Sequence, residues 1–182
     1  EFFLDQGYFG WLVPENQGIA RIGIASLTNA KQHFDHLMTK RPGKILEWQS
    51  GVIPVYDPKL ATQHQQRVFL VGDAATHVKA STYGGIIPGM MAAEELRTAI
   101  NTGKNYEKLW KKRIGKELWL HRLIRKMMDK FTPADFDNLI HLVNQPKIKN
   151  IISTHDREFP SKILFTMLLK EPRFLTYLPY AF

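Results

Sequence analysis

The first quarter of the chain has the hydrophobic pattern of a β-hairpin. Residues 2–14 are rich in aromatic and branched side chains, and residues 18–26 alternate apolar side chains with small or polar ones, as half-buried strands do. Residues 14–18, Pro-Glu-Asn-Gln-Gly, have the composition of a turn. The pattern therefore predicts two antiparallel strands joined by a short connection.

A helix and a further short strand are expected next. Residues 30–40 carry apolar side chains at helical spacing, with Asn29 in the capping position before them and Pro42-Gly43 after them. Residues 49–55 contain several branched apolar side chains and predict a strand.

The most informative pattern is a hydrophobic run that leads to a glycine-rich helix start. Residues 67–71, Arg-Val-Phe-Leu-Val, are typical of a strand buried on both faces of a parallel sheet, and they end at Gly72-Asp73. After a loop, Gly84-Gly85-Ile86 begins a helix that ends near Gly103. This order of elements is found at ligand sites of α/β proteins.

A long amphipathic helix is expected over residues 106–131, and it carries most of the excess positive charge. The whole chain has 25 basic and 17 acidic residues, a formal net charge of +8. Between residues 102 and 131 there are only three acidic residues but ten basic ones. The basic residues are Lys104, Lys108, Lys111, Lys112, Arg113, Lys116, Arg122, Arg125, Lys126 and Lys130. With Trp110 and Trp119 interleaved, this face suits solvent, an anionic membrane or nucleic acid. Nucleic acid ranks third because no recognised binding module is present.

The remaining residues predict shorter helices. Thr132-Pro133, supported by Asp135, is a start signal for a helix that Pro146 ends. Residues 160–182 are apolar and aromatic, and two prolines interrupt them, Pro172 and Pro179.

Composition excludes several classes of protein. With 182 residues, 44% of them apolar, the chain is long enough for a domain with its own core. It has no cysteine, which excludes a disulfide framework, a thiolate nucleophile and a zinc site built on sulfur. Its apolar runs are far shorter than the roughly 20 residues that span a bilayer. His33 and His36 share a helix face but lack a third ligand nearby in sequence, so we expect no metal site.

The residues at the expected strand tip suit a ligand that has hydroxyl groups and an anionic part. The Asp73 carboxylate can accept hydrogen bonds from such hydroxyls, although Gly72-Asp73 taken alone could equally be a local turn. A helix entered through Gly84 and Gly85 presents backbone N–H groups and a positive dipole end, which favour a phosphate or an anionic ring. In the loop between them, His77 could donate a proton and Lys79 could meet a phosphate.

The run from Arg67 to Ile86 resembles the second flavin-binding motif of the FAD-dependent oxidoreductases with the p-hydroxybenzoate hydroxylase fold. Val78-Lys79 and the run from Thr82 to Ile86 are most similar to the geranylgeranyl reductases. The resemblance implies that Asp73 binds a ribityl hydroxyl of FAD and that the helix start stabilises the reduced, anionic flavin. The cofactor-binding residues that it implies are Gly72, Asp73, Ala74, Ala75, Thr82, Gly84, Gly85 and Ile86.

A second resemblance concerns the substrate. Phe9-Gly10-Trp11, which lead to a proline turn, and Gly18 after it are similar to the strand pair that lines the isoprenoid cavity of these reductases. Phe9, Trp11 and Gly18 are therefore the implied substrate-binding residues. The family usually has glycine where this chain has Ala20, and a hairpin with aromatic core residues is the alternative interpretation. No catalytic residue is assigned.

The resemblance extends over about residues 7–142 and lacks the Gly-x-Gly-x-x-Gly motif that binds the ADP half of FAD. We therefore expect the C-terminal portion of a flavoprotein of α+β or α/β class, whose missing N-terminal half completes the FAD site. Residues 1–60 would form part of the antiparallel substrate-binding sheet. Residues 61–103 would be the last strand, loop and helix of the flavin domain, and residues 104–182 a helical C-terminal region.

The expected function of the whole protein is reduction of prenyl-chain double bonds by hydride transfer from reduced FAD. The alternatives are an FAD-dependent monooxygenase or halogenase of the same fold, or a non-catalytic basic membrane-binding module. The expected partners are a prenyl or other apolar small molecule, the missing flavin-binding half and a peripheral membrane surface, with no nucleic acid. Because the chain opens on Glu1 without a signal-peptide pattern, we expect a trimmed cytoplasmic protein, in contact with the membrane at most peripherally.

Overall fold

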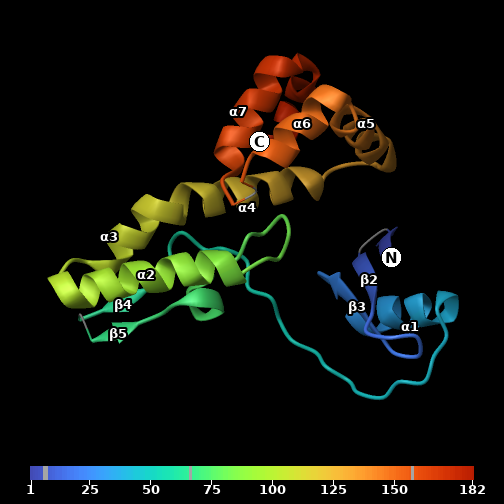
Figure 1. Cartoon of the computed structure of the whole chain (residues 1–182), viewed down its shortest axis with the longest axis horizontal. Helices are drawn as coiled ribbons and strands as arrows, with labels where there is room; N and C mark the ends of the chain where they lie inside the picture. Colours follow the sequence, from blue (N-terminus) through green and yellow to red (C-terminus); the bar gives the residue numbers. More distant parts are fainter. Residues whose placement is uncertain (6–7, 66, 157) are drawn as a thin grey trace. The chain divides into compact units, whose positions relative to one another are not determined.

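The computed structural model describes residues 1–5, 8–65, 67–156 and 158–182, and the chain divides into two compact units (Figure 1). The first unit is Glu1–Gly51 and the second is Val52–Phe182. Each is described by itself below. Within the described ranges, no helix is both long and apolar enough to cross a bilayer.

The first unit is a three-stranded antiparallel sheet with one helix. Strands β1 (Phe2–Asp5), β2 (Tyr8–Pro14) and β3 (Ala20–Ser26) pair in that order, and α1 spans Ala30–Lys40. The predicted hairpin and the predicted helix are therefore confirmed. In the turn, the Asn16 side-chain oxygen accepts hydrogen bonds from the N–H groups of Gly18 and Ile19, which is the local bonding that favours asparagine in turns.

Two sequence predictions fail in this part of the chain. Asn29 precedes α1 in the left-handed conformation, φ 53°, and its side chain caps none of the described N–H groups. The strand expected over residues 49–55 is absent, because this segment pairs with no described strand and Val52 is 94% exposed. Its neighbour Trp48 packs edge-on against Phe34 of α1 instead, with ring centroids 4.8 Å apart.

The second unit begins with short irregular elements. Strands β4 (Gln63–His64) and β5 (Val68–Phe69) form a two-residue antiparallel pair, followed by a 3₁₀ turn η1 (Gly72–Ala75) and helix α2 (Ile86–Thr102). The strand expected over residues 67–71 is thus shorter than predicted, antiparallel rather than parallel, and 55% exposed at Val68. A parallel strand needs parallel neighbours, and within the described residues β5 pairs only with β4.

The long amphipathic helix is confirmed as one continuous path, with a π-helical turn inside it. It consists of α3 (Tyr106–Trp110), the π turn η2 (Lys111–Gly115) and α4 (Lys116–Met128). The predicted Thr132 cap is also present, as a reciprocal capping box with Asp135.

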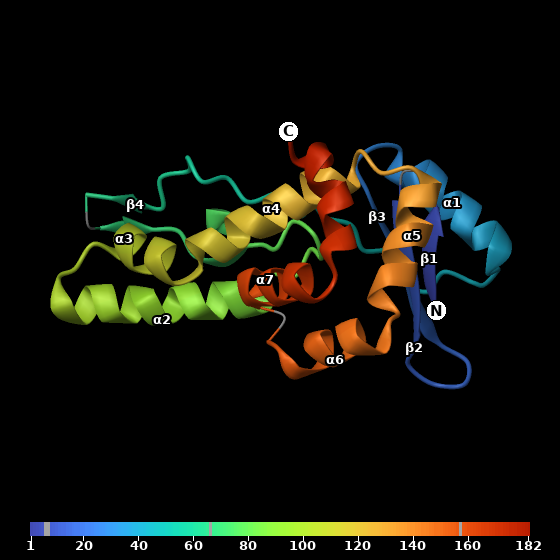
Figure 2. The same ribbon diagram turned by 90° about the horizontal axis from the view of Figure 1, so that it is seen from above.

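The C-terminal residues form a small helical layer against α4 (Figure 2). It contains α5 (Pro133–Val143), α6 (Pro146–Thr154), α7 (Pro160–Lys170) and the 3₁₀ segment η3 (Pro172–Ala181). Pro146 opens α6 rather than only ending the helix before it, and Pro179 lies inside η3 rather than interrupting the chain. The position of Pro146 at the start of α6 agrees with proline's fixed φ and missing N–H.

The core of the second unit is centred on Trp110. This side chain is 1% exposed and packs among buried residues of the segment before β4 and of α2, α3, η2 and α4: Tyr56, Ala92, Ala99, Tyr106, Ile114 and Leu118. The Trp110 indole N–H donates to Thr62 Oγ1 at 2.7 Å, and the Tyr106 hydroxyl donates to the Leu70 carbonyl at 2.9 Å. The irregular segment before η1 is thereby held on the helices.

We predict that Thr62→Val destabilises the protein by about 1–3 kcal/mol, because the isosteric change leaves the buried indole N–H without an acceptor. Urea unfolding followed by circular dichroism measures this change. Thr176→Val, at an exposed threonine, is the matched control and should stay within about 0.5 kcal/mol of the parent. Equal stability of both variants would contradict this role of Thr62.

Candidate functional site

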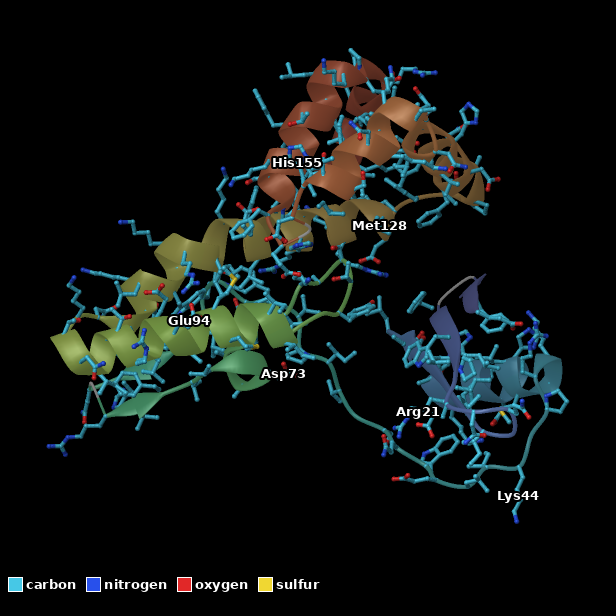
Figure 3. All side chains as sticks on the ribbon, viewed as in Figure 1. Arg21, Lys44, Asp73, Glu94, Met128 and His155 are labelled. Atoms are coloured by element: carbon cyan, nitrogen blue, oxygen red, sulfur yellow. The ribbon has the colours of Figure 1, made fainter. Side chains whose placement is uncertain are left out.

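The structure brings the glycines and the carboxylate of the predicted motif together at the start of α2. Gly72 has φ +66°, a left-handed conformation that favours glycine. A Cβ placed on Gly85 would lie 2.9 Å from Asp73 Oδ1, and a Cβ on Gly89 would lie 3.3 Å from the Gly72 Cα. The first turn of α2 therefore rests directly on η1, with the Asp73 side chain beside it (Figure 3).

The start of α2 is open to solvent. Gly85 is its N-cap residue, and among the described side chains none caps the helix. Ile86 is 79% exposed, and Asp73, Ala74 and Thr82 are exposed as well. Since the first N–H groups of a helix lack intrahelical acceptors and carry the positive end of its dipole, this surface suits an anionic or hydrogen-bond-accepting ligand.

The predicted site residues differ in burial. Ala75 is 1% exposed and faces the core, whereas Gly72, Gly84 and Gly85 are half-buried. Because the whole residue is buried, Ala75 offers no surface to a ligand.

Three side-chain contacts hold the loop that leads into α2. Lys79 Nζ lies 2.6 Å from Glu158 Oε1, and both side chains are largely buried. Ser81 Oγ shares a 2.6 Å hydrogen bond with His121 Nδ1, and the Arg125 guanidinium lies over the Tyr83 ring at 5.6 Å. Lys79 is thus paired with a carboxylate rather than free to meet a phosphate.

Two histidines are buried behind this loop. His77 is 0% exposed, its ring centroid lies 4.5 Å from that of Trp110, and neither ring nitrogen has a hydrogen-bond partner among the described residues. Burial lowers the His77 pKa to about 4. Burial, with the nearby Lys79 charge, lowers the pKa of His121 to about 4 as well. Because His77 faces the core, the predicted proton-donor role at an exposed ligand is wrong.

The predicted substrate residues lie in the other unit, on the hairpin. Phe9 and Trp11 are adjacent on β2, with ring centroids 5.8 Å apart. Gly18 lies in the turn and is not brought to them. The glycine that meets Trp11 is Gly23, its partner in the strand register, where an added Cβ would lie 2.5 Å from Trp11 Cζ2. The turn at residues 14–20 fixes this register, so the Trp11–Gly23 pair could have been found from the sequence.

A shallow hollow of about 180 Å³ lies at the other end of α2, lined by Gln63, Phe69, Ala99, Ile100, Gly103 and Lys104. It contains none of the predicted site residues, and the length of α2 places it about 25 Å from Gly85. Among the described residues, no cluster of three or more His, Asp or Glu side chains could hold a metal ion.

Comparisons with known proteins point to one group. No protein-family profile matches the chain. The chain is 28% identical over 93% of its length to digeranylgeranylglycerophospholipid reductase 2 of Methanothermobacter thermautotrophicus, and 25% identical over 83% to the digeranylgeranylglycerophospholipid reductase of Methanothrix thermoacetophila. The chain is thus similar in sequence to digeranylgeranylglycerophospholipid reductases over most of its length. The predicted resemblance to this family is therefore confirmed, whereas the roles of the individual site residues stay predictions.

The chain spans less than half the length of these relatives, 46% and 44% respectively. The crystal structure of a geranylgeranyl bacteriochlorophyll reductase-like protein from Thermoplasma acidophilum matches the whole chain with a TM-score of 0.71 at 23% identity. The chain covers 50% of that structure. The mixed helical and small-sheet fold is thus shared with about half of a geranylgeranyl reductase-like protein.

We predict that the stability of the second unit falls as the pH falls from about 6.5 to about 4. The unfolded chain takes up protons on His77 and His121 in this range, whereas the folded chain keeps both rings neutral. Each histidine should contribute up to about 1.4 kcal/mol per pH unit, and its contribution is fully present only above about pH 6.5.

Urea unfolding at a series of pH values measures this slope. His77→Phe keeps the packing against Trp110 but removes one titrating group, so the slope should become shallower. His64→Phe, at an exposed histidine, is the matched control and should leave the slope unchanged. An identical slope in the parent and in His77→Phe would show that His77 does not titrate as its burial requires.

Proposed function

We propose that this chain is part of a flavin-dependent reductase that saturates double bonds in the prenyl chains of a lipid. The names of its relatives support reduction of a digeranylgeranylglycerophospholipid. The observation that carries the flavin proposal is the Asp73 carboxylate beside Gly85 at the uncapped start of α2. Oxidoreductase activity is proposed for the whole protein, of which this chain would form one half.

The residues at the start of α2 fit FAD in three respects. The Asp73 carboxylate is exposed and can accept a hydrogen bond from a ribityl hydroxyl. The absence of a Cβ at Gly85 leaves room for that carboxylate. The N–H groups at the helix start favour a negative charge by about 0.3–1 kcal/mol, which suits the pyrimidine edge of a reduced flavin. Reduced FAD, when bound, would supply the hydride for the double bond.

The hairpin residues fit an apolar substrate. Phe9 and Trp11 place two aromatic rings side by side on β2, and the Trp11 ring lies across Gly23. A prenyl chain offers only apolar surface, so its binding would rest on contact area with such side chains. In this proposal these residues position the substrate, and none of them exchanges a proton with it.

The rest of the FAD site would come from residues outside this chain. The sequence has no Gly-x-Gly-x-x-Gly motif for the ADP half of the cofactor. The second unit also exposes apolar side chains on α2 and β5: Ile86, Met90, Ile100 and Val68 are each more than half exposed. In this proposal the further flavin-binding segment would cover some of these side chains.

The relatives' names favour the reductase over the monooxygenase or halogenase of the same fold. The chemistry also separates them, because a reductase needs no oxygen and adds hydrogen to the substrate. The non-catalytic alternative predicts a protein that binds no flavin.

We predict that the native protein, isolated from its source, is yellow. We also expect it to be about twice the length of this chain, because the chain covers 46% and 44% of two relatives. Under anaerobic conditions with a chemical reductant, it should add one H₂ to each reduced double bond of digeranylgeranylglycerophospholipid, measured by mass spectrometry. A native protein that contains no flavin would overturn the proposal. A yellow protein that acts only with oxygen would favour the monooxygenase.

We predict that Asp73→Asn weakens FAD binding to that protein by about 10- to 100-fold, since it removes a charge-assisted hydrogen bond. Gly85→Ala should weaken it too, because the added Cβ displaces the carboxylate. Gly43→Ala, where a Cβ would meet no atom within 4 Å, is the control and should leave binding unchanged. Equilibrium dialysis with FAD measures all three, and unchanged affinity in Asp73→Asn would contradict the assigned role.

A further inference from the structure

The structure separates the paired cations of the long helical rod from those without an acidic partner. Figures 1 and 2 show α3, η2 and α4 as one continuous rod. Three of its cations are paired on the flanks: Lys111 with Glu107 at 2.5 Å, Arg113 with Glu94 at 2.6 Å and Arg125 with Asp129 at 2.5 Å. Lys108, Lys112 and Lys116 are exposed and have no acidic partner among the described residues.

The π turn brings these three lysines into one line. In an α-helix, residues four apart rotate by about 40° relative to each other, so three such residues would spread over about 80°. The turn at Lys111–Gly115 has the wider i→i+5 hydrogen bonding of a π-helix. Each residue of such a turn rotates by less than in an α-helix, and this offsets most of the spread of about 80°. Lys108, Lys112 and Lys116 therefore form a straight row, opposite the buried face of Trp110, Ile114 and Leu118.

An exposed indole continues the row. Trp119 follows Lys116 by three residues, at the spacing of side-chain neighbours on a helix, and it is 51% exposed, whereas Trp110 on the buried face is 1% exposed. Tryptophan favours the boundary between water and lipid because its ring is apolar and its N–H is polar. The row thus combines three charges with one amphipathic ring.

We infer that Lys108, Lys112, Lys116 and Trp119 form a docking face for an anionic lipid bilayer, with the rod lying flat on the headgroups. A straight row of cations presents all its charges to a plane at once, and the indole can enter the headgroup layer beside them. The flanking salt bridges engage Lys111, Arg113 and Arg125, whereas the three lysines of the row, like the exposed Arg122 further along α4, have no acidic partner among the described residues. The inference goes beyond the proposed reductase function and does not depend on flavin binding.

The test is co-sedimentation of the 182-residue chain with phosphatidylcholine vesicles that contain or lack phosphatidylglycerol. Binding should require phosphatidylglycerol and weaken with salt. The variant K108Q/K112Q/K116Q should bind on the order of 100-fold more weakly, since each lysine near an anionic surface contributes about fivefold. The control K44Q/K59Q/K149Q removes three exposed lysines elsewhere, so it carries the same net charge and should bind within about fivefold of the parent.

Brominated lipids provide a second measurement, because they quench only tryptophans that enter the bilayer. Quenching should occur in the parent and largely disappear in Trp119→Phe, while Trp119→Phe still binds the vesicles. Equal weakening by the two triple variants would overturn the proposal in favour of a net-charge effect. Binding to an oligonucleotide duplex without binding to the anionic vesicles would overturn it in favour of nucleic acid.

Discussion

The second unit depends on the burial of one indole. Trp110 contacts three separate stretches of the chain. The Tyr56 ring lies edge-on to the indole, with ring centroids 6.4 Å apart, and the centroid of the His77 ring lies 4.5 Å from that of Trp110. The Thr62 hydroxyl oxygen accepts a hydrogen bond from the indole N–H. The described residues between Val52 and Gly85 contain only two short strands and one 3₁₀ turn, so few backbone hydrogen bonds between strands hold them. Their positions are set by side chains that converge on this ring, and the His77 backbone in turn lies next to Gly85.

The same helical rod contacts the loop of the candidate site on one side and carries the proposed docking face on another. The side of α4 toward the site supplies His121 to Ser81 and Arg125 to Tyr83. The exposed side carries Lys116 and Trp119. Because a helix is stiff along its length and changes direction only at identifiable defects, whatever binds the exposed side would have a fixed relation to the loop that leads into α2.

Local patterns in the sequence predicted the local structure. The hairpin follows from alternation on both sides of a turn, and the α5 start follows from a capping box, which spans only four residues. The short β5 strand was mispredicted because a parallel sheet is a property of several strands, and the run over residues 67–71 shows hydrophobicity without showing its partners. The strand predicted over residues 49–55 is absent for the same reason, because its apolar side chains do not show whether a partner strand is present.

The sequence indicated which residues lie at the start of α2, but it did not indicate the side-chain contacts that hold the loop before that helix. The order of Asp73, Gly84 and Gly85 indicates a ligand edge, and the structure brings Asp73 and Gly85 together. The contacts that hold the loop join residues far apart in sequence, as in Lys79 with Glu158, and no periodicity reports such a pair. The π turn could not be predicted from the sequence either, because Lys111–Gly115 has the composition of an ordinary amphipathic helix.

The helix starts of the second unit differ in how their first N–H groups are satisfied. Asn105 caps α3 by accepting from the Lys108 N–H, and Thr132 with Asp135 caps α5 reciprocally. In both helices the chain's own side chains satisfy the first N–H groups. The start of α2 has Gly85 at its N-cap and Pro88, which has no N–H, in its first turn. α6 and α7 also begin without a side-chain cap, and what distinguishes α2 is the Asp73 carboxylate beside Gly85. A helix of 17 residues that leaves its N-terminus uncapped and exposed retains hydrogen-bond donors for an external acceptor. In the proposed function, the Asp73 carboxylate would accept a hydrogen bond from a hydroxyl of the ligand, and a flavin with its ribityl chain offers both a hydroxyl and a ring that becomes anionic.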